Sequence, residues 1–264
     1  MKCSLFKTIE KRKRTMMTPR VAAIHDMSGF GRCSLTVAIP ILSAMGVQCC
    51  PLPTAFLSTH TGGFEGFTFL DMTDEMSKVA DHWASLGLTF QAVYSGFLGS
   101  ERQIGVVENF ICRFRGPDTV VVVDPVMGDY GRVYQTYTAA MCSGMARLAE
   151  LADVITPNLT EAALLGQPYE MLPAGEAGLR EITERLSLGG RRSVVLTGAS
   201  LAPGRTGAVC FDARTGKTEA VQTAYVAHEF HGTGDVFSSV LTGALVRGES
   251  LSSAAGEAAA FVRA

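Results

Sequence analysis

The segment HGTGD, residues 231–235, places two glycines, a threonine and an aspartate just ahead of an apolar run. Gly232 and Gly234 allow the backbone to turn several N–H groups toward one point, and the start of the following helix adds partial positive charge there. The pattern predicts a phosphate cradle formed by Gly232, Thr233 and Gly234. Asp235 falls inside this cradle, where a carboxylate can act as a general base on a hydroxyl group.

Two further segments carry acids suited to a nucleotide and Mg²⁺. In VVVVDPVMGD (120–129), Asp124 directly follows four valines that are typical of a buried strand. In ITPNLTEA (155–162), Asn158 and Glu161 are three residues apart at a predicted helix start, so both can face one site. Mg²⁺ prefers oxygen ligands and keeps several waters, so Asp124 and Glu161 could hold it through water. The structural alternatives are a loop cap at Asp124 and a capped helix start at Asn158 and Glu161.

The glycine-rich segment DMSGFGR (26–32) follows the first predicted strand. It has Ser34 where a dinucleotide-binding loop has its third glycine, and no acid lies about 20 residues further on, which argues against NAD. We interpret Asp26 and Ser28 as hydrogen-bonding groups for a small ligand, with a plain tight turn as the alternative.

The segment TAFLSTHTGGFEGF (54–67) is rich in hydroxyl, glycine and aromatic residues. It predicts a pocket wall that stacks on a flat ring, with Thr61 as a hydrogen-bonding group. The alternative is a surface loop, and for His60 a structural role is favoured over a catalytic one.

Strand-like and helix-like segments alternate along the chain, which predicts a mostly parallel sheet covered on both faces. Predicted strands are 20–26, 47–53, 90–96, 119–125, 153–157 and 193–198, followed by a hairpin over 207–223 that turns at Thr215-Gly216. Predicted helices are 34–46, 71–87, 100–114, 137–149, 160–165, 175–188, 233–246 and 250–263. Ligands bind beyond the carboxyl ends of such strands. The polar residues expected there are Asp26, Ser28, Thr61, Ser95, Asp124, Asn158 and Thr197, with Asp235 at a helix start.

Composition limits the class of protein. Residues 1–20 carry seven basic side chains and one acid, whereas residues 21–264 carry 16 basic and 24 acidic ones, a net charge of −8. We expect residues 1–19 to be a disordered extension, residues 20–264 to be a single domain, and no nucleic-acid partner. No apolar run is long enough to cross a membrane. The seven cysteines have no CxxC spacing, which favours reduced thiols in a cytoplasmic protein and argues against zinc.

The motifs THTGG, DPVMGD, TPNLTEA and HGTGD occur in this order within residues 20–264. Together they resemble the ribokinase-like superfamily and, within it, the vitamin B6 kinases. The resemblance implies a three-layer α/β/α sandwich with a mostly parallel central sheet. It also implies transfer of the γ-phosphoryl group of ATP, with Mg²⁺, to the 5′-hydroxymethyl group of pyridoxal, pyridoxine or pyridoxamine. A homodimer is common in such kinases, and a need for a monovalent cation stays open.

The same resemblance assigns roles to individual residues. Asp235 matches the catalytic base, and Gly232, Thr233 and Gly234 match the anion hole. Nucleotide and Mg²⁺ positions are matched by Asp124, Thr156 and Glu161, with Asn158 beside them and Thr197 at a strand end that contacts the nucleotide. Asp26 stands where many relatives have a serine that faces the pyridine, and Thr61 matches a second substrate contact.

Two departures from the B6 kinase pattern keep alternatives open. Asp26 in place of serine is similar to the Asp-x-Ser-Gly loop of hydroxymethylpyrimidine kinases, the enzymes of thiamine synthesis. The sequence also stops inside an apparent helix, GEAAAFVRA, where relatives continue, so we expect a truncated C-terminus. A non-catalytic vitamin-binding regulator is therefore the alternative from another class of protein, and a sugar kinase is a further one.

Overall fold

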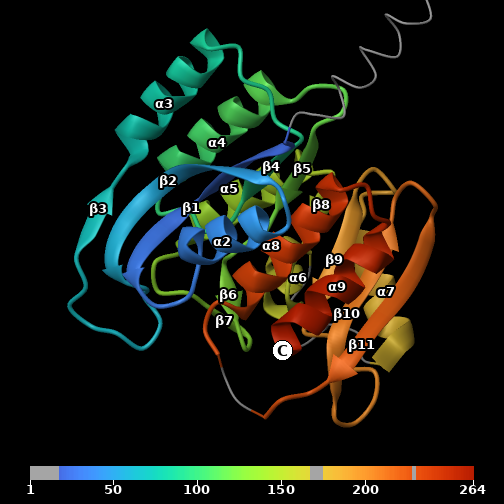
Figure 1. Ribbon diagram of the computed structural model, residues 1–264. Coiled ribbons are helices and arrows are strands. Elements are labelled where there is room, and N and C mark those ends of the chain that lie inside the picture. Colours follow the sequence, from blue (N-terminus) through green and yellow to red (C-terminus); the bar gives the residue numbers. More distant parts are fainter. Residues whose placement is uncertain (1–17, 167–174, 228–229) are drawn as a thin grey trace, which may run out of the picture.

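The computed structural model describes residues 18–166, 175–227 and 230–264. This part of the chain forms three layers, with one nine-stranded sheet between two layers of helices (Figure 1). The predicted three-layer α/β/α sandwich with a mostly parallel sheet is confirmed. The extension predicted for residues 1–19 falls mainly on residues 1–17, which lie outside the described residues. No described helix combines the length and the apolar character that a membrane span requires.

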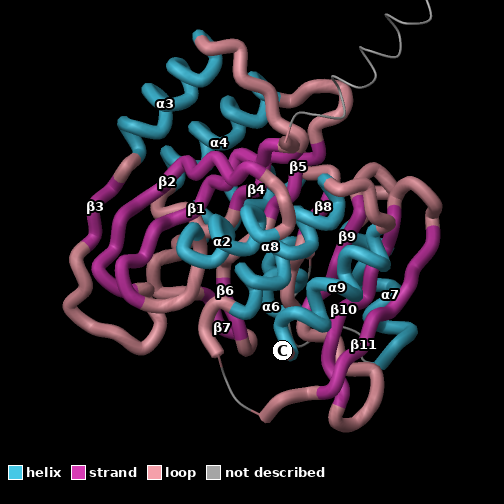
Figure 2. Tube along the Cα trace, in the orientation of Figure 1, coloured by secondary structure: helices cyan, strands magenta, loops and turns pink. Residues whose placement is uncertain are grey.

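The strands are arranged in the order β11-β10-β9-β8-β5-β4-β1-β2-β3 (Figure 2). The parallel part consists of β1 (Arg20–Phe30), β2 (Gln48–Thr59), β4 (Ala92–Ser95), β5 (Val120–Val123), β8 (Val154–Ile155) and β9 (Ser193–Thr197). Antiparallel strands close both sides, namely β3 (Phe69–Asp71), β10 (Arg205–Asp212) and β11 (Lys217–Ala224). A separate two-stranded sheet joins β6 (Gly128–Asp129) and β7 (Arg132–Val133).

Alternate side chains of the central strands pack on opposite helix layers, because successive residues of a strand point to opposite faces. Ile24, Val93 and Val121 face the first layer, whereas Tyr94 and Val122 face the second. The first layer consists of α3 (Thr73–Ser85), α4 (Glu101–Phe114), α5 (Ala139–Glu150), α6 (Leu159–Leu165) and α7 (Gly175–Leu186). The second, in front of the sheet in Figure 1, consists of α2 (Leu35–Ala44), α8 (Thr233–Val246) and α9 (Leu251–Arg263).

The predicted ends of the first two strands are wrong. β1 continues past residue 26 to Phe30 and β2 continues past residue 53 to Thr59, because each strand offers the other a hydrogen-bonding edge over this extra length. The pairing shifts register between His25 and Met27, so Asp26 lies at an irregularity of β1. Asp26 and Ser28 therefore belong to the strand and not to a loop that follows it. Such irregularities re-aim side chains and are common beside active sites.

The buried amide of Gln103, in α4, ties strand β2, the segment after β4 and the start of α3 together. Gln103 Nε2 donates to the carbonyl of Thr54 (2.8 Å) and lies 3.0 Å from the hydroxyl of Thr73, while Oε1 accepts from the N–H of Gly99 (2.7 Å). We expect Gln103→Met to lower the free energy of unfolding by about 2–4 kcal/mol, because it leaves buried backbone groups unpaired. Denaturant unfolding measures this. The exposed Gln135→Met is the control, and an equally small effect at both positions would contradict the role of the amide network.

Candidate active site

Three aspartates from distant parts of the sequence, of which Asp26 and Asp124 are buried and Asp235 is half-buried, gather at the carboxyl ends of the parallel strands. Asp26 comes from β1, Asp124 directly follows β5, and Asp235 lies in the first turn of α8. Their surroundings disfavour negative charge. Burial is the largest cause at each and raises the pKa of Asp235 to about 7, that of Asp124 to about 6, and that of Asp26 above its ordinary value. The site is thus poised to accept protons or cations.

Asp235 has the environment of a general base. Its side chain is 15% exposed, so one edge reaches the site while the rest is enclosed. The backbone N–H of Ser34 stabilises the ionised carboxylate, but this effect is smaller than the cost of burial. The charges of Asp124 and Asp26 raise the pKa of Asp235 further. A base whose pKa lies near neutrality is well matched to proton transfer at physiological pH.

The start of α8 requires glycine at residue 232. Gly232 adopts a left-handed conformation (φ 82°), and a Cβ there would collide with the carbonyl oxygen of Arg32. The first turn of a helix leaves backbone N–H groups without partners inside the helix. Thr233 and Gly234 lie in this exposed turn, and a Cβ on Gly234 would meet nothing within 4 Å. This geometry suits the predicted phosphate cradle, whose anion-binding role stays a prediction.

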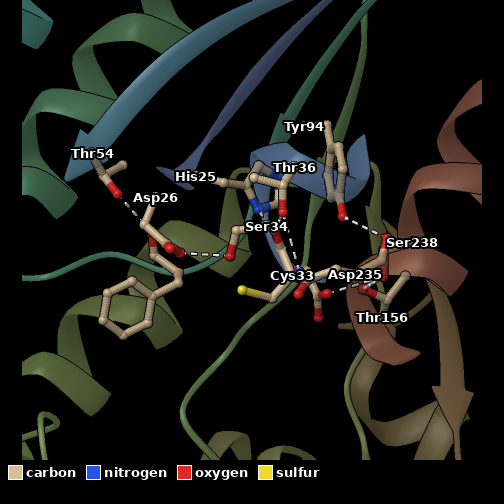
Figure 3. A network of polar contacts seen from close by, with 12 residues as sticks. His25, Asp26, Cys33, Ser34, Thr36, Thr54, Tyr94, Thr156, Asp235 and Ser238 are labelled. Carbon is tan, nitrogen blue, oxygen red and sulfur yellow. Dashed lines mark hydrogen bonds and ion pairs between the residues drawn. The ribbon is translucent and has the colours of Figure 1, made fainter. Parts of the chain in front are cut away.

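Asp26 is held by two serine hydroxyls. Ser34 Oγ donates to Oδ1 at 2.5 Å and Ser28 Oγ donates to Oδ2 at 3.1 Å (Figure 3). Ser28 is fully buried and orients Asp26, and its interpretation as a ligand-binding group stays a prediction. The two hydrogen bonds lower the pKa of Asp26 and offset part of the rise caused by burial.

Ser34 is the residue that connects the two acids, and the sequence did not single it out as functional. It has φ 52° and ψ −131°, a backbone conformation that non-glycine residues seldom adopt. In this conformation its N–H faces Asp235 and its hydroxyl faces Asp26. The sequence signal for Ser34 was its position, because it stands where a dinucleotide-binding loop has its third glycine. Strain of this kind concentrates at functional sites.

Ser238 links the third acid to the same helix. Its Oγ lies 3.0 Å from both Asp124 Oδ2 and Thr156 Oγ1. Ser238 follows Asp235 by three residues and so lies on a neighbouring part of the same helix face.

Asn158 and Glu161 form the capping box that was the structural alternative at this position. Asn158 Oδ1 accepts from the N–H of Glu161 (2.9 Å), and its Nδ2 donates to the carbonyl of Gly128 (2.9 Å). The Glu161 carboxylate accepts from the N–H groups of Asn158 (2.9 Å) and Met127 (3.2 Å). Asn158 has thus a clear structural task, and a role in ATP binding stays a prediction.

The pair Asp124 and Glu161 fits a divalent cation in its chemistry. Both acids are buried, and burial followed by the charge of Asp124 raises the pKa of Glu161 well above its ordinary value. A hard cation nearby would relieve this repulsion, and carboxylate oxygens are the donors that Mg²⁺ prefers. Within the described ranges, no group of three or more His, Cys, Asp or Glu side chains forms a metal cluster. Mg²⁺ sites commonly complete their coordination with water and substrate phosphates.

The remaining predicted residues lie around this centre. Thr197 ends β9, and its hydroxyl donates to the carbonyl of Pro157 at 3.3 Å. Ser95 ends β4 and is buried, as expected for a strand end that faces the site. Thr61 is exposed in the segment between β2 and β3, and its substrate contact stays a prediction. In that segment the ring of His60 lies 5.0 Å from the ring of His231, directly before the cradle.

A mostly parallel three-layer sandwich with acids at the strand ends and a glycine-bounded helix start defines a ribokinase-like kinase. Residues 39–264 match the model of the phosphomethylpyrimidine kinase family, and the chain belongs to this family. Asp26 lies outside the matched residues, whereas Asp124, Glu161 and Asp235 lie within them.

Individual relatives carry the names of vitamin B6 kinases. The pyridoxine/pyridoxal/pyridoxamine kinase of Bordetella bronchiseptica is 29% identical over 90% of this chain and 85% of its own length. A Bacteroides thetaiotaomicron structure assigned as a phosphomethylpyrimidine kinase, in a crystal form with pyridoxal, is 45% identical with a TM-score of 0.87 over 93% of this chain and 86% of its own. The Leishmania donovani pyridoxal kinase in complex with ADP and pyridoxamine has the same fold, at 22% identity and a TM-score of 0.82 over 92% and 84% of the two chains.

The raised pKa of Asp235 makes the free energy of unfolding depend on pH. Its pKa is about 7 in the folded protein and about 4 in an unfolded chain, so the folded protein loses relative stability as the pH rises from about 4 to 7. Asp235→Asn removes the ionisable group. We expect it to change stability little at pH 4 and to stabilise the protein by at most about 4 kcal/mol at pH 8.

Thermal or denaturant unfolding at the two pH values tests this prediction. Asp74→Asn is the control, because Asp74 is 70% exposed and its ion pair with Arg102 lies in solvent, where such pairs contribute little to stability. A stabilisation by Asp235→Asn that did not grow between pH 4 and pH 8 would show that Asp235 is ionised in the folded protein at low pH.

Proposed function

We propose that this protein is an ATP-dependent kinase that phosphorylates the 5′-hydroxymethyl group of pyridoxal, pyridoxine or pyridoxamine. The observation that carries the proposal is Asp235, a half-buried base with a pKa near neutrality in the first turn of a helix whose glycine start suits a phosphate. Further support comes from the 29% identity to a Bordetella B6 kinase and from the Bacteroides homologue crystallised with pyridoxal.

The proposed mechanism uses the residues of the site in three ways. Asp235 accepts the proton of the substrate hydroxyl as the oxygen attacks the γ-phosphorus of ATP and ADP leaves. The N–H groups of Gly232, Thr233 and Gly234 at the α8 start hold charge on the transferred phosphoryl group, beside the open space next to Gly234. Mg²⁺, held through water by Asp124 and Glu161, would neutralise phosphate charge. Thr156 and Thr197 lie at strand ends that suit nucleotide contacts, while Asp26 and Thr61 are assigned to the substrate ring.

A hydroxymethylpyrimidine kinase is the second candidate function. Two observations favour it, namely the description of the matching family and the carboxylate of Asp26 at the proposed ring site. An acid there can accept hydrogen bonds from the amino group of a pyrimidine as well as from a protonated pyridine. The transferred group and the catalytic residues would be the same. A non-catalytic vitamin-binding regulator is a third reading, which the complete HGTGD segment disfavours.

A substrate panel with ATP and Mg²⁺ tests the function. We expect pyridoxal, pyridoxine or pyridoxamine to be phosphorylated with at least about tenfold higher kcat/KM than hydroxymethylpyrimidine, which corresponds to about 1.4 kcal/mol of transition-state discrimination. ADP release and mass spectrometry of the product measure this. Turnover of hydroxymethylpyrimidine alone would establish the second candidate, and binding of a vitamer without turnover would establish the regulator. Asp235→Asn, which should bind ATP without turnover, links any activity to this site.

A pair of glycine variants tests the phosphate cradle. Gly234→Ala adds a methyl group that meets nothing within 4 Å in the protein, so the variant should fold with unchanged or higher thermal stability. We expect its kcat/KM for ATP to fall by about tenfold or more, because the methyl group would enter the space assigned to phosphate. Gly105→Ala is the control, since it is also a helical glycine with open space around it but lies in α4. Full activity of Gly234→Ala would place the phosphate elsewhere.

The proposed assembly and location follow from the same family assignment. We propose a cytoplasmic homodimer that binds neither nucleic acid nor membranes. The exposed apolar side chains of Phe56, Phe69 and Leu70 on β2 and β3 are consistent with contact to a second copy. A monovalent cation requirement stays open.

A further inference from the structure

His25 is a fully buried side chain that none of the steps above uses. It lies in β1 next to Asp26, and neither ring nitrogen has a hydrogen-bond partner within the described part of the chain. Leaving a buried polar group unpaired costs about 1–3 kcal/mol, so native proteins keep few of them. A histidine in such a place is therefore expected to have a partner in some working state of the protein.

The surroundings hold the His25 ring in one place. The ring of Tyr94, on the neighbouring strand β4, packs edge-on against it with a centroid distance of 4.2 Å and an interplanar angle of 67°. Directly after β4, Gly96 leaves the space that the His25 ring fills, because a Cβ at residue 96 would collide with His25 Nδ1. Tyr94 of β4 and Gly96 directly after it thus shape a slot for this imidazole.

The ring is directed at the proposed base. His25 Nδ1 lies 3.9 Å from Asp235 Oδ1, and both side chains point into the same network (Figure 3). Burial lowers the pKa of His25 to about 3, so the ring is neutral near pH 7 and the contact is not an ion pair. A hydrogen bond between these atoms needs a separation near 2.9 Å, which a carboxylate movement of about 1 Å would provide.

We propose that His25 is a positioning residue for Asp235, and that its Nδ1–H donates to Asp235 Oδ1 when the carboxylate turns toward the acceptor hydroxyl. The role as a partner of the carboxylate follows from the geometry alone. Its consequence for turnover rests on the proposed function, in which Asp235 is the base.

A neutral donor suits this task better than a cation would. An arginine or lysine at residue 25 would hold the Asp235 carboxylate in its ionised form and weaken it as a base. A neutral N–H orients the carboxylate with a smaller effect on its pKa.

The other groups that face Asp235 leave room for such a donor. Asp26 of β1 and Asp124 after β5 raise the pKa of Asp235, and the N–H of Ser34 lowers it. Burial keeps the nearby Cys33 thiol protonated, with a pKa of about 11. On β4, the Tyr94 hydroxyl donates to the backbone carbonyl of Asp235 at 3.5 Å, so it does not serve the carboxylate.

A pair of substitutions of nearly equal shape tests the proposal. His25→Asn keeps an N–H donor close to the position of Nδ1, whereas His25→Leu has a similar volume and no polar atom. We expect His25→Leu to raise the pKa of Asp235 by about one unit, because the ionised form loses a donor. We expect His25→Asn to restore it to within about 0.3 units of the wild-type value.

The titration is followed by NMR on protein with ¹³C-labelled aspartate carboxyl groups, with the Asp235 signal assigned from Asp235→Asn. No substrate is needed, so the result stands even if the substrate panel fails.

In the kinase assay, kcat at pH 7 should fall about tenfold in His25→Leu with KM unchanged. The acid limb of the pH profile of kcat should move to higher pH. Equal Asp235 titrations in the wild type and His25→Leu would overturn the proposal. So would equal shifts in His25→Leu and His25→Asn, which would indicate a packing role alone.

A measurement on the wild-type protein covers the case in which both variants unfold. ¹⁵N-histidine spectra distinguish the two neutral tautomers of His25. We expect the Nδ1–H tautomer above pH 7, with chemical shifts that follow the Asp235 titration. An Nε2–H tautomer above pH 7 would overturn the proposal, because Nδ1 could then not donate to the ionised carboxylate.

Discussion

The close approach of Gly232 to the carbonyl oxygen of Arg32 fixes how the two halves of the site meet. Gly232 begins α8 near the C-terminus, and Arg32 lies in the turn between β1 and α2 near the N-terminus. Only a residue without Cβ permits this contact, since both the left-handed backbone and the carbonyl oxygen exclude a side chain. The contact sets the start of α8 against Ser34, and Ser34 in turn reaches both Asp235 and Asp26.

The same arrangement makes ionisation of the acids in the site unfavourable, which a kinase can use. Asp26, Asp124 and Asp235 lie in an environment where each is costly to ionise, and the pKa of Asp235 is raised by the other two. Folding alone would be better served by neutral residues there. A bound cation or positively polarised group lowers the free energy of the ionised carboxylates. The acids therefore destabilise the folded protein without ligands but favour ligand binding and the acceptance of a proton. Stability and function are thus opposed at these three residues.

The sequence predicted the architecture well because the signals for it are local. Alternating valine-rich strands and helices, the turn at Thr215-Gly216 and the helix starting at Thr233 are all present as expected. The length of β1 was underestimated because Ser28 and Gly29 are poor strand formers, and only the pairing with β2 keeps this part of the chain extended. The short strands β3, β6 and β7 depend on tertiary contacts in the same way.

The structure brings several of the predicted site residues together and adds connections between them that the sequence did not predict. Motif spacing brought Asp124, Thr156 and Asp235 to one edge of the sheet, but spacing cannot tell which side chain bonds to which. By residue type, nothing in the sequence marks Ser34, Ser238 or His25 as unusual. Ser34 has a strained φ angle, Ser238 shares a helix face with Asp235, and His25 fills the slot beside Gly96. Each of these depends on long-range packing.

The identity of the proposed substrate depends on what Asp26 can distinguish. Its two oxygens already accept hydrogen bonds from Ser28 and Ser34, so under the proposed function its remaining acceptor capacity would serve a donor or a positive charge on the ligand. A protonated pyridine and an aminopyrimidine both offer such a donor, so Asp26 favours either over a neutral sugar without separating them. Discrimination between the two rings therefore falls to groups around the ring edge. The segment with His60, Thr61 and Phe64 is the place to look for such groups. The rings of His60 and Phe64 lie 4.9 Å apart there, beside the site.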